Sequence, residues 1–300
     1  MTVSRRDIFF TSRDGLRLHA RSFDPSEITD FPVICLPGLT RNSRDFTTLA
    51  DALAEAGHRV IAVDYRGRGK SEYDSDWRNY SPFMEALDVT DLMARESISQ
   101  AHFIGTSRGG LICMILASMR PTGLLSVVMN DIGPVIEREG LARIIGYVGR
   151  TPHPIDWNDA ARLVREINNR DFNGVQESEW LAVAQQWFND DNGRPIQGYD
   201  SRLAKAVTNV DLDRALPELW PQFRAMQRYP LLIIRGENSD ILSAKTVEKM
   251  CRLHPGAQTM VVPGQGHAPL LRDTASISAV ISFLEHQDRS TMVASEASAA

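Results

Sequence analysis

The sequence predicts an α/β fold in which helices flank a mostly parallel, eight-stranded sheet that carries an α-helical cap insertion. Between about residues 33 and 133, short apolar runs alternate with segments whose apolar residues recur at helical spacing. From about residue 134 to residue 227 this alternation stops, and amphipathic helical patterns follow one another with no convincing strand. Strand and helix patterns alternate again from about residue 230. Alternation of this kind is typical of parallel strands covered by helices on both faces.

The elements follow in order along the chain. An Asp-Gly turn at residues 14 and 15 joins two alternating runs, 7–11 and 16–22, and predicts an N-terminal β-hairpin. Further strands are expected at residues 33–36, 59–63, 102–104, 124–129, 230–234 and 259–262. Helices are expected over about 46–56, over 82–97 behind an N-cap at Ser81, after an N-cap at Ser243, and over about 275–285. Within the insertion, helical patterns cover 157–168 and 177–188.

The pattern divides the chain into a core and an insertion. The core domain is predicted over residues 1–133 and 228–289, and the helical cap over residues 134–227. Residues 290–300 are rich in alanine and serine and are expected to be a disordered tail.

Composition excludes several classes of protein. A formal net charge of -5 over 300 residues lacks the concentrated basic excess of nucleic-acid binders. No stretch approaches eighteen consecutive apolar residues, and the first residues do not resemble a signal peptide. We therefore expect a cytoplasmic protein that binds neither nucleic acid nor membrane. The sequence leaves the oligomeric state open, with a homodimer as one alternative.

The three cysteines, Cys35, Cys113 and Cys251, are odd in number, lie in apolar surroundings and lack metal-ligand spacing. This usage indicates reduced, buried thiols. We expect no bound metal and no cofactor.

The most informative motif is Gly105-Thr106-Ser107-Arg108-Gly109, which matches G-x-S-x-G between an apolar run and a helical segment. The flanking glycines allow strand and helix to pack closely around a sharp turn, and the helix directs backbone N–H groups toward developing negative charge. This context makes Ser107 a candidate nucleophile for acyl transfer.

A serine nucleophile needs a base and a carboxylate that orients the base. His267, in a glycine-rich loop after the last predicted strand, is the leading candidate for the base. Asp240, in the loop after the strand 230–234, is the candidate acid and precedes His267 in chain order. Glu237 and Asp131 are competing carboxylates, and Asp131 is also a candidate for lining a substrate pocket.

The oxyanion of a tetrahedral intermediate needs two preorganised donors. The backbone N–H of Arg108 is one candidate. The second is the N–H of Leu39, in the turn that ends the strand 33–36.

These motifs, taken in order, resemble the α/β-hydrolase superfamily from about Phe9 to Glu285. The segment Asp64 to Ser71 is similar to the family's D-x-R-G-x-G-x-S turn, whose arginines and glycines are usually structural. The helical insertion falls where that family carries its cap domain. The chain departs from the family at Leu36, where many members have histidine before Pro/Gly.

The resemblance implies a cofactor-independent serine hydrolase that acts on a small carboxylic ester or lactone. Ser107 argues against epoxide hydrolases and haloalkane dehalogenases, which use aspartate as the nucleophile. Three alternatives stay open: a carbon–carbon bond hydrolase or an acyltransferase that uses the same triad, and a ligand-binding receptor without catalysis. Aromatic residues of the cap, among them Trp157 and Trp187, are candidates for lining the substrate pocket.

Overall fold

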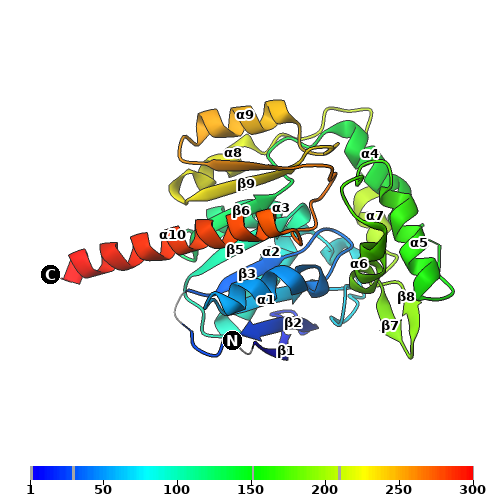
Figure 1. The fold of residues 1–300 in the computed structure, drawn as a ribbon, viewed down its shortest axis with the longest axis horizontal. Coiled ribbons are helices and arrows are strands. Elements are labelled where there is room, and N and C mark those ends of the chain that lie inside the picture. The colour runs from blue at the N-terminus through cyan, green and yellow to red at the C-terminus, as the bar shows by residue number, and fades with distance from the viewer. Residues whose placement is uncertain (1–2, 29–30, 151, 209–210, 300) are drawn as a thin grey trace.

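The computed structural model describes residues 3–28, 31–150, 152–208 and 211–299, and only the backbone of residues 290–299. Eight strands form one sheet in the order β1-β2-β4-β3-β5-β6-β9-β10 (Figure 1). The first two pairings, β1 with β2 and β2 with β4, are antiparallel, and the others are parallel. The prediction of a mostly parallel, eight-stranded sheet is therefore confirmed.

The strands of this sheet lie close to the predicted positions. They are β1 (Ser4–Thr11), β2 (Arg17–Asp24), β3 (Val33–Leu36), β4 (Val60–Asp64), β5 (Ala101–Thr106), β6 (Leu124–Asn130), β9 (Leu231–Gly236) and β10 (Gln258–Val262). The helices associated with the sheet are η1 (Ser43–Phe46), α1 (Thr47–Glu55), η2 (Trp77–Asn79), α2 (Pro82–Arg95), α3 (Arg108–Met119), α9 (Ala244–Leu253) and α10 (Thr274–Ala299). The side chains of Ser81 and Ser243 cap α2 and α9 as predicted.

Helices cover both faces of the sheet because the parallel strands are buried on both sides. In β3, Ile34 and Leu36 pack in one cluster with residues of α2, α3 and α9. Their neighbours Val33 and Cys35 belong to a second cluster with residues of α1 and α10. Such strands consist of near-continuous apolar runs, which is why they could be located in the sequence.

The segment between β6 and β9 is mainly helical. Its elements from Arg138 to Thr208 gather on one side of the sheet (Figure 1), whereas those from Trp220 to Arg228 pack against α3. The segment contains α4 (Arg138–Tyr147), α5 (Trp157–Asn168), η3 (Glu177–Glu179), α6 (Trp180–Trp187), α7 (Leu203–Thr208), α8 (Trp220–Ala225) and η4 (Met226–Arg228). The expectation that it holds no strand is wrong, because β7 (Asn189–Asp191) and β8 (Arg194–Ile196) pair antiparallel. Each has three residues, too few to give a strand pattern.

This insertion is fastened to the core on two sides. Near η1, Asn42 Nδ2 donates to the Gln186 carbonyl at 2.9 Å, and Arg44 Nη2 donates to the Phe188 carbonyl at 2.9 Å. On the other side, the Gly174 N–H donates to the carbonyl of Gly264 at 2.9 Å, within the loop that follows β10. The insertion therefore contacts loops from both halves of the sheet.

The C-terminal helix is longer than expected. Residues 290–300 are predicted to be disordered, but α10 continues to Ala299 and extends away from the body of the protein (Figure 1). Alanine, methionine and glutamate are strong helix formers, so the composition that suggests a tail also favours a helix. Residue 300 lies outside the described residues.

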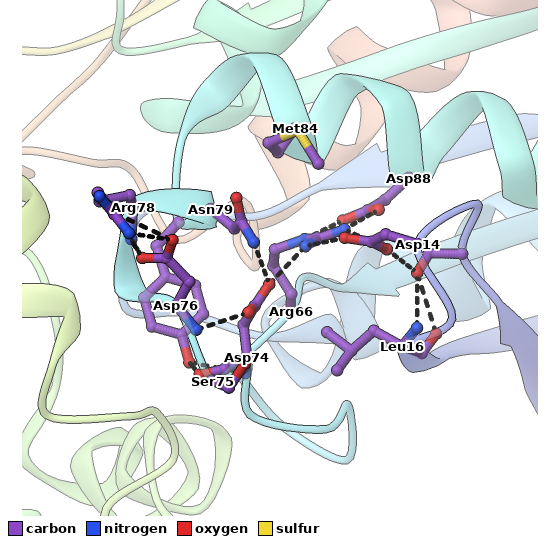
Figure 2. Close-up of polar contacts among 12 residues, drawn as sticks. Asp14, Leu16, Arg66, Asp74, Ser75, Asp76, Arg78, Asn79, Met84 and Asp88 are labelled. Carbon is purple, nitrogen blue, oxygen red and sulfur yellow. Dashed lines mark hydrogen bonds and ion pairs between the residues drawn. The ribbon is translucent and has the colours of Figure 1, made fainter.

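A buried ion network joins the N-terminal hairpin to α2 (Figure 2). Arg66, in the turn after β4, is fully buried and bonds three carboxylates. It donates to Asp88 of α2 at 2.6 and 2.8 Å, to Asp74 at 2.7 Å, and to Asp14 of the β1–β2 turn at 2.9 Å. The hydrogen bond from Arg66 lowers the pKa of Asp14 to about 2, whereas burial raises the pKa of Asp88 to about 6.

We expect Arg66→Met to lower the free energy of unfolding by about 3–5 kcal/mol, because it leaves buried carboxylates without their cation. Urea denaturation of native and variant protein measures the difference. Arg78→Met is the matched control, since Arg78 is exposed and, among the described residues, pairs with nearby Asp76 alone. Its cost should stay below about 0.5 kcal/mol. Equal losses in both variants would contradict a structural role for the network.

Candidate active site

Ser107 lies on the turn between β5 and α3 with strained backbone angles, φ 52° and ψ -113°. A residue other than glycine rarely adopts a positive φ, and such backbone strain is found mainly at functional sites. Backbone hydrogen bonds hold the turn, because the Ser107 N–H donates to the Asn130 carbonyl at 2.9 Å and the Ser107 carbonyl accepts from Gly110 at 2.9 Å.

The two glycines of the motif are required by close packing. A Cβ on Gly105 would lie 2.6 Å from the carbonyl carbon of Gly109, and a Cβ on Gly109 would lie 2.1 Å from the carbonyl oxygen of Leu36. Neither position has room for a side chain. Strand β5, helix α3 and the end of β3 therefore meet around Ser107 as closely as their backbones permit.

Three side chains at the carboxyl ends of parallel strands form a hydrogen-bonded chain. Ser107 Oγ lies 2.8 Å from His267 Nε2, and His267 Nδ1 lies 2.8 Å from Asp131 Oδ2. Ser107 follows β5, Asp131 follows β6 and His267 follows β10. Asp131 is fully buried and the side chain of His267 is 6% exposed. This is the arrangement of a nucleophile, its base and an orienting carboxylate.

The carboxylate in this chain is Asp131, not Asp240. The prediction that Asp240 orients His267 is wrong, and so is the prediction that Asp131 lines the pocket. Asp240 is bound by Arg143 of α4 at 2.6 and 2.8 Å. Burial raises the pKa of Asp240, but the hydrogen bonds from Arg143 and the positive charges of Arg143 and His267 together lower it more, so that the net shift is downward. The other competitor, Glu237, accepts from the N–H of Gly264, whereas the ring nitrogens of His267 bond Asp131 and Ser107.

The loop after β9 supplies donors where an acid was expected. The Ser239 hydroxyl donates to Asp131 Oδ2 at 2.6 Å, and the Gly236 N–H donates to Asp131 Oδ1 at 2.8 Å. With His267, these groups give the Asp131 carboxylate three hydrogen-bond donors. Because two neighbouring strands each end in an acidic loop, the sequence could not determine which carboxylate would be held this way.

The two predicted oxyanion donors, Leu39 and Arg108, belong to segments that lie next to Ser107. Arg108 is the first residue of α3, so its N–H has no acceptor within the helix. The turn that holds Leu39 lies against Ser107, since a Cβ on Gly38 would be 3.9 Å from Ser107 Cβ. The carbonyl of Leu39 accepts from Arg68 Nε at 2.9 Å, which fixes the orientation of the turn.

A buried carboxylate connects the supports of these two donors. Glu85 of α2 is fully buried and accepts from Arg108 Nε at 2.5 Å. Its other oxygen lies 2.9 Å from Arg68 Nη1, an ion pair whose angles are not those of a hydrogen bond. Glu85 therefore links the turn that carries Leu39 with the first residue of α3. Glu85 cannot be recognised from the sequence, because nothing there distinguishes it from other glutamates on helices.

Ser107 and His267 open into a cavity of about 90 Å³. We refer to it as the catalytic pocket. Its walls include Leu39, Arg41, Arg143, Phe172 and Trp187. Trp187 thus lies where the sequence suggested. Trp157 does not line the pocket and packs instead with α5 and α6 in a separate apolar cluster.

The part of the chain that the structure describes has neither a metal-binding cluster nor a helix that could span a membrane. No group of three or more His, Cys, Asp or Glu side chains is placed to hold a metal ion there. None of the described helices has the length and apolarity needed to cross a bilayer.

Comparison with known proteins identifies the family. The profile of the α/β hydrolase fold matches residues 32–274. A 3-hydroxybutyrate-oligomer hydrolase from Cupriavidus necator is 31% identical over 84% of this chain and 87% of its own. The chain therefore belongs to the α/β-hydrolase fold family.

Two further relatives agree with this assignment. An esterase from Escherichia coli K12 is 26% identical over 79% of this chain and 85% of its own. The crystal structure of an α/β hydrolase from Novosphingobium aromaticivorans superposes with a TM-score of 0.87 and 40% identity, covering 95% of this chain and 99% of the other. Since these relatives are hydrolases, they support hydrolase activity for this chain.

We expect a fluorophosphonate to label Ser107, because such reagents react with a serine whose hydroxyl is activated by a base. Ser107→Ala should take up no label by intact mass. Asp131→Asn should slow labelling on the order of 10³-fold, because the imidazole loses its orienting carboxylate. Asp240→Asn, the matched control, should react close to the native rate. Slow labelling of Asp240→Asn together with fast labelling of Asp131→Asn would reverse our assignment.

Proposed function

We propose that the protein is a serine hydrolase that cleaves small carboxylic esters or lactones through an acyl-enzyme intermediate. The observation that carries this proposal is the chain of two 2.8 Å contacts from Ser107 through His267 to Asp131. The proposed carboxylate that orients His267 is Asp131, in place of the Asp240 expected from the sequence.

In the first half of the reaction, His267 Nε2 takes the proton of Ser107 as its oxygen attacks the substrate carbonyl carbon. Asp131 accepts from Nδ1–H, which holds the imidazole in the tautomer that leaves Nε2 free to act as a base. The tetrahedral intermediate collapses when the imidazolium returns the proton to the leaving alkoxide. The products of this half are an alcohol and an acyl group bonded to Ser107.

In the second half, water replaces the alcohol. His267 takes a proton from water, the hydroxide attacks the acyl carbon, and the proton returns to Ser107 as the acid leaves. In both halves, the N–H groups of Leu39 and Arg108 would donate to the oxyanion. Each such donor contributes about 3 kcal/mol of transition-state stabilisation.

The size of the catalytic pocket supports a short acyl group. The proposed cap, residues 134–227, supplies Trp187 and Phe172 to its walls and would exclude water from the reacting atoms. One relative is named for hydrolysis of 3-hydroxybutyrate oligomers and another as an esterase. Linear esters of short hydroxy acids are therefore the first substrates to test.

We expect Ser107→Ala to lower kcat/KM for 4-nitrophenyl acetate and butyrate on the order of 10⁶-fold, because no other group can form the acyl intermediate. Release of 4-nitrophenol measures the rate, and an unchanged circular dichroism spectrum shows that the fold is intact. Undiminished turnover by the folded variant would refute the assignment of Ser107.

Analysis of the acyl product formed from the same substrates separates hydrolysis from acyl transfer. With competing alcohols present, a hydrolase yields mainly the free acid, whereas an acyltransferase yields mainly the new ester. A product mixture dominated by new ester at low alcohol concentration would contradict the proposal that water is the acceptor.

A further inference from the structure

A small side chamber adjoins the catalytic pocket. Its volume is about 30 Å³, and it shares Arg41, Tyr147 and Trp187 with the walls of the catalytic pocket. Gln197, from the segment after β8, closes the chamber from the insertion side. The chamber is therefore enclosed by the turn after β3 on one side and by the insertion on the other.

Arg41 lies close to the proposed nucleophile. A Cβ on Gly38 would be 3.2 Å from Arg41 Cγ and 3.9 Å from Ser107 Cβ, so these two atoms are at most about 7.1 Å apart. The Nε and Nη2 atoms of Arg41 both donate to Asp45 at 2.7 Å, and the guanidinium lies 3.7 Å from the ring centre of Trp187. These contacts fix the guanidinium without using Nη1.

Three buried donors around the chamber have no hydrogen-bond partner among the described residues. They are Arg41 Nη1, Trp187 Nε1 and Gln197 Nε2. Buried polar groups are normally satisfied, so three such donors around one chamber need an explanation. The unsatisfied atoms of its lining residues are all donors, and one of them is cationic.

A carboxylate is the complement of this arrangement. It has two acceptor oxygens with about four lone-pair sites, and it has no proton to donate. A hydrogen bond from a guanidinium to a carboxylate is charge-assisted and stronger than one to a neutral carbonyl. A water molecule would fit the same volume, but it accepts only two hydrogen bonds and carries no charge.

We propose that the side chamber is a carboxylate subsite, and that the preferred substrate is a short ester that also carries a free carboxylate. This inference rests on the proposed ester hydrolysis at Ser107. A single small molecule can reach both places because Arg41 and Ser107 lie on the walls of the same pocket. An ester-linked dimer of a short hydroxy acid has these two groups.

The test compares one ester with and without its negative charge. The probes are the linear dimer of 3-hydroxybutyrate with a free carboxyl group and the primary amide of the same dimer, which has the same single ester bond and no charge. The native protein should favour the free acid by about 10- to 100-fold in kcat/KM, the range expected for hydrogen bonds to a charged group. The ratio of the two values is the readout, so a general loss of activity does not affect it.

Two changes to the chamber should bring this ratio toward one. Gln197→Glu introduces a negative charge that repels the carboxylate. The double variant Arg41→Met with Asp45→Asn removes a cation and its partner together, so the chamber loses the donor without gaining an unpaired Asp45. Arg162→Met is the control, because Arg162 is an exposed arginine of α5 that pairs with Asp159 and Glu166. It should keep the native ratio.

The outcomes separate this inference from the proposed function. If native protein hydrolyses 4-nitrophenyl butyrate but shows no preference for the acid, the chamber holds only water and the inference fails alone. If neither 4-nitrophenyl butyrate nor either form of the dimer is hydrolysed, the proposed function fails. A protection experiment then tests the carboxylate subsite on its own. We ask whether the 3-hydroxybutyrate anion slows the reaction of Ser107 with fluorophosphonate and whether its methyl ester does not. Protection that Gln197→Glu abolishes would support the subsite, and its absence would overturn it.

Discussion

The arrangement of the proposed active site depends on a single buried carboxylate. Glu85 has no access to solvent and lies between Arg68 and Arg108, so the attraction on both sides offsets the cost of removing its charge from water. Arg68 holds the carbonyl of Leu39, and Arg108 begins α3. The Glu85 side chain of α2 therefore fixes the positions of the two loops around Ser107 relative to each other. Their backbones need little reorganisation when charge develops, which is the condition for electrostatic stabilisation of a transition state.

The turn after β4 connects these loops to the rest of the core through hydrogen bonds. Asp64 accepts from the backbone of Ser43 at 2.6 Å and of Lys70 at 2.8 Å, which joins the start of η1 to the turn itself. The Ser71 hydroxyl donates to the Asp64 carbonyl at 2.7 Å. Arg66 then binds the N-terminal hairpin and α2, while Arg68 supports the turn beside Ser107. Each polar residue of this turn thus has a distinct structural partner.

Local signals explain what could be predicted from the sequence. The strands were found because they are continuous apolar runs, and Ser107 and His267 because each stands in a glycine-rich loop directly after a strand. The position of Asp131 beside His267 depends on how the loop after β9 packs on β6, which no local pattern reports. Trp157 could not be separated from Trp187 for the same reason, since both are tryptophans of amphipathic helices. Glu85 and the donors of the side chamber become meaningful only when distant segments meet.

The attachment of the insertion on two sides of the pocket bears on how molecules enter and leave. A segment hinged at one edge can swing open, but hydrogen bonds from η1 on one side and from the loop after β10 on the other oppose such a rotation. Opening the pocket at either of these edges would first have to break those hydrogen bonds. Under the proposed function, the width of such an opening would select among substrates before any chemistry begins, and its rate would limit how fast the product acid leaves.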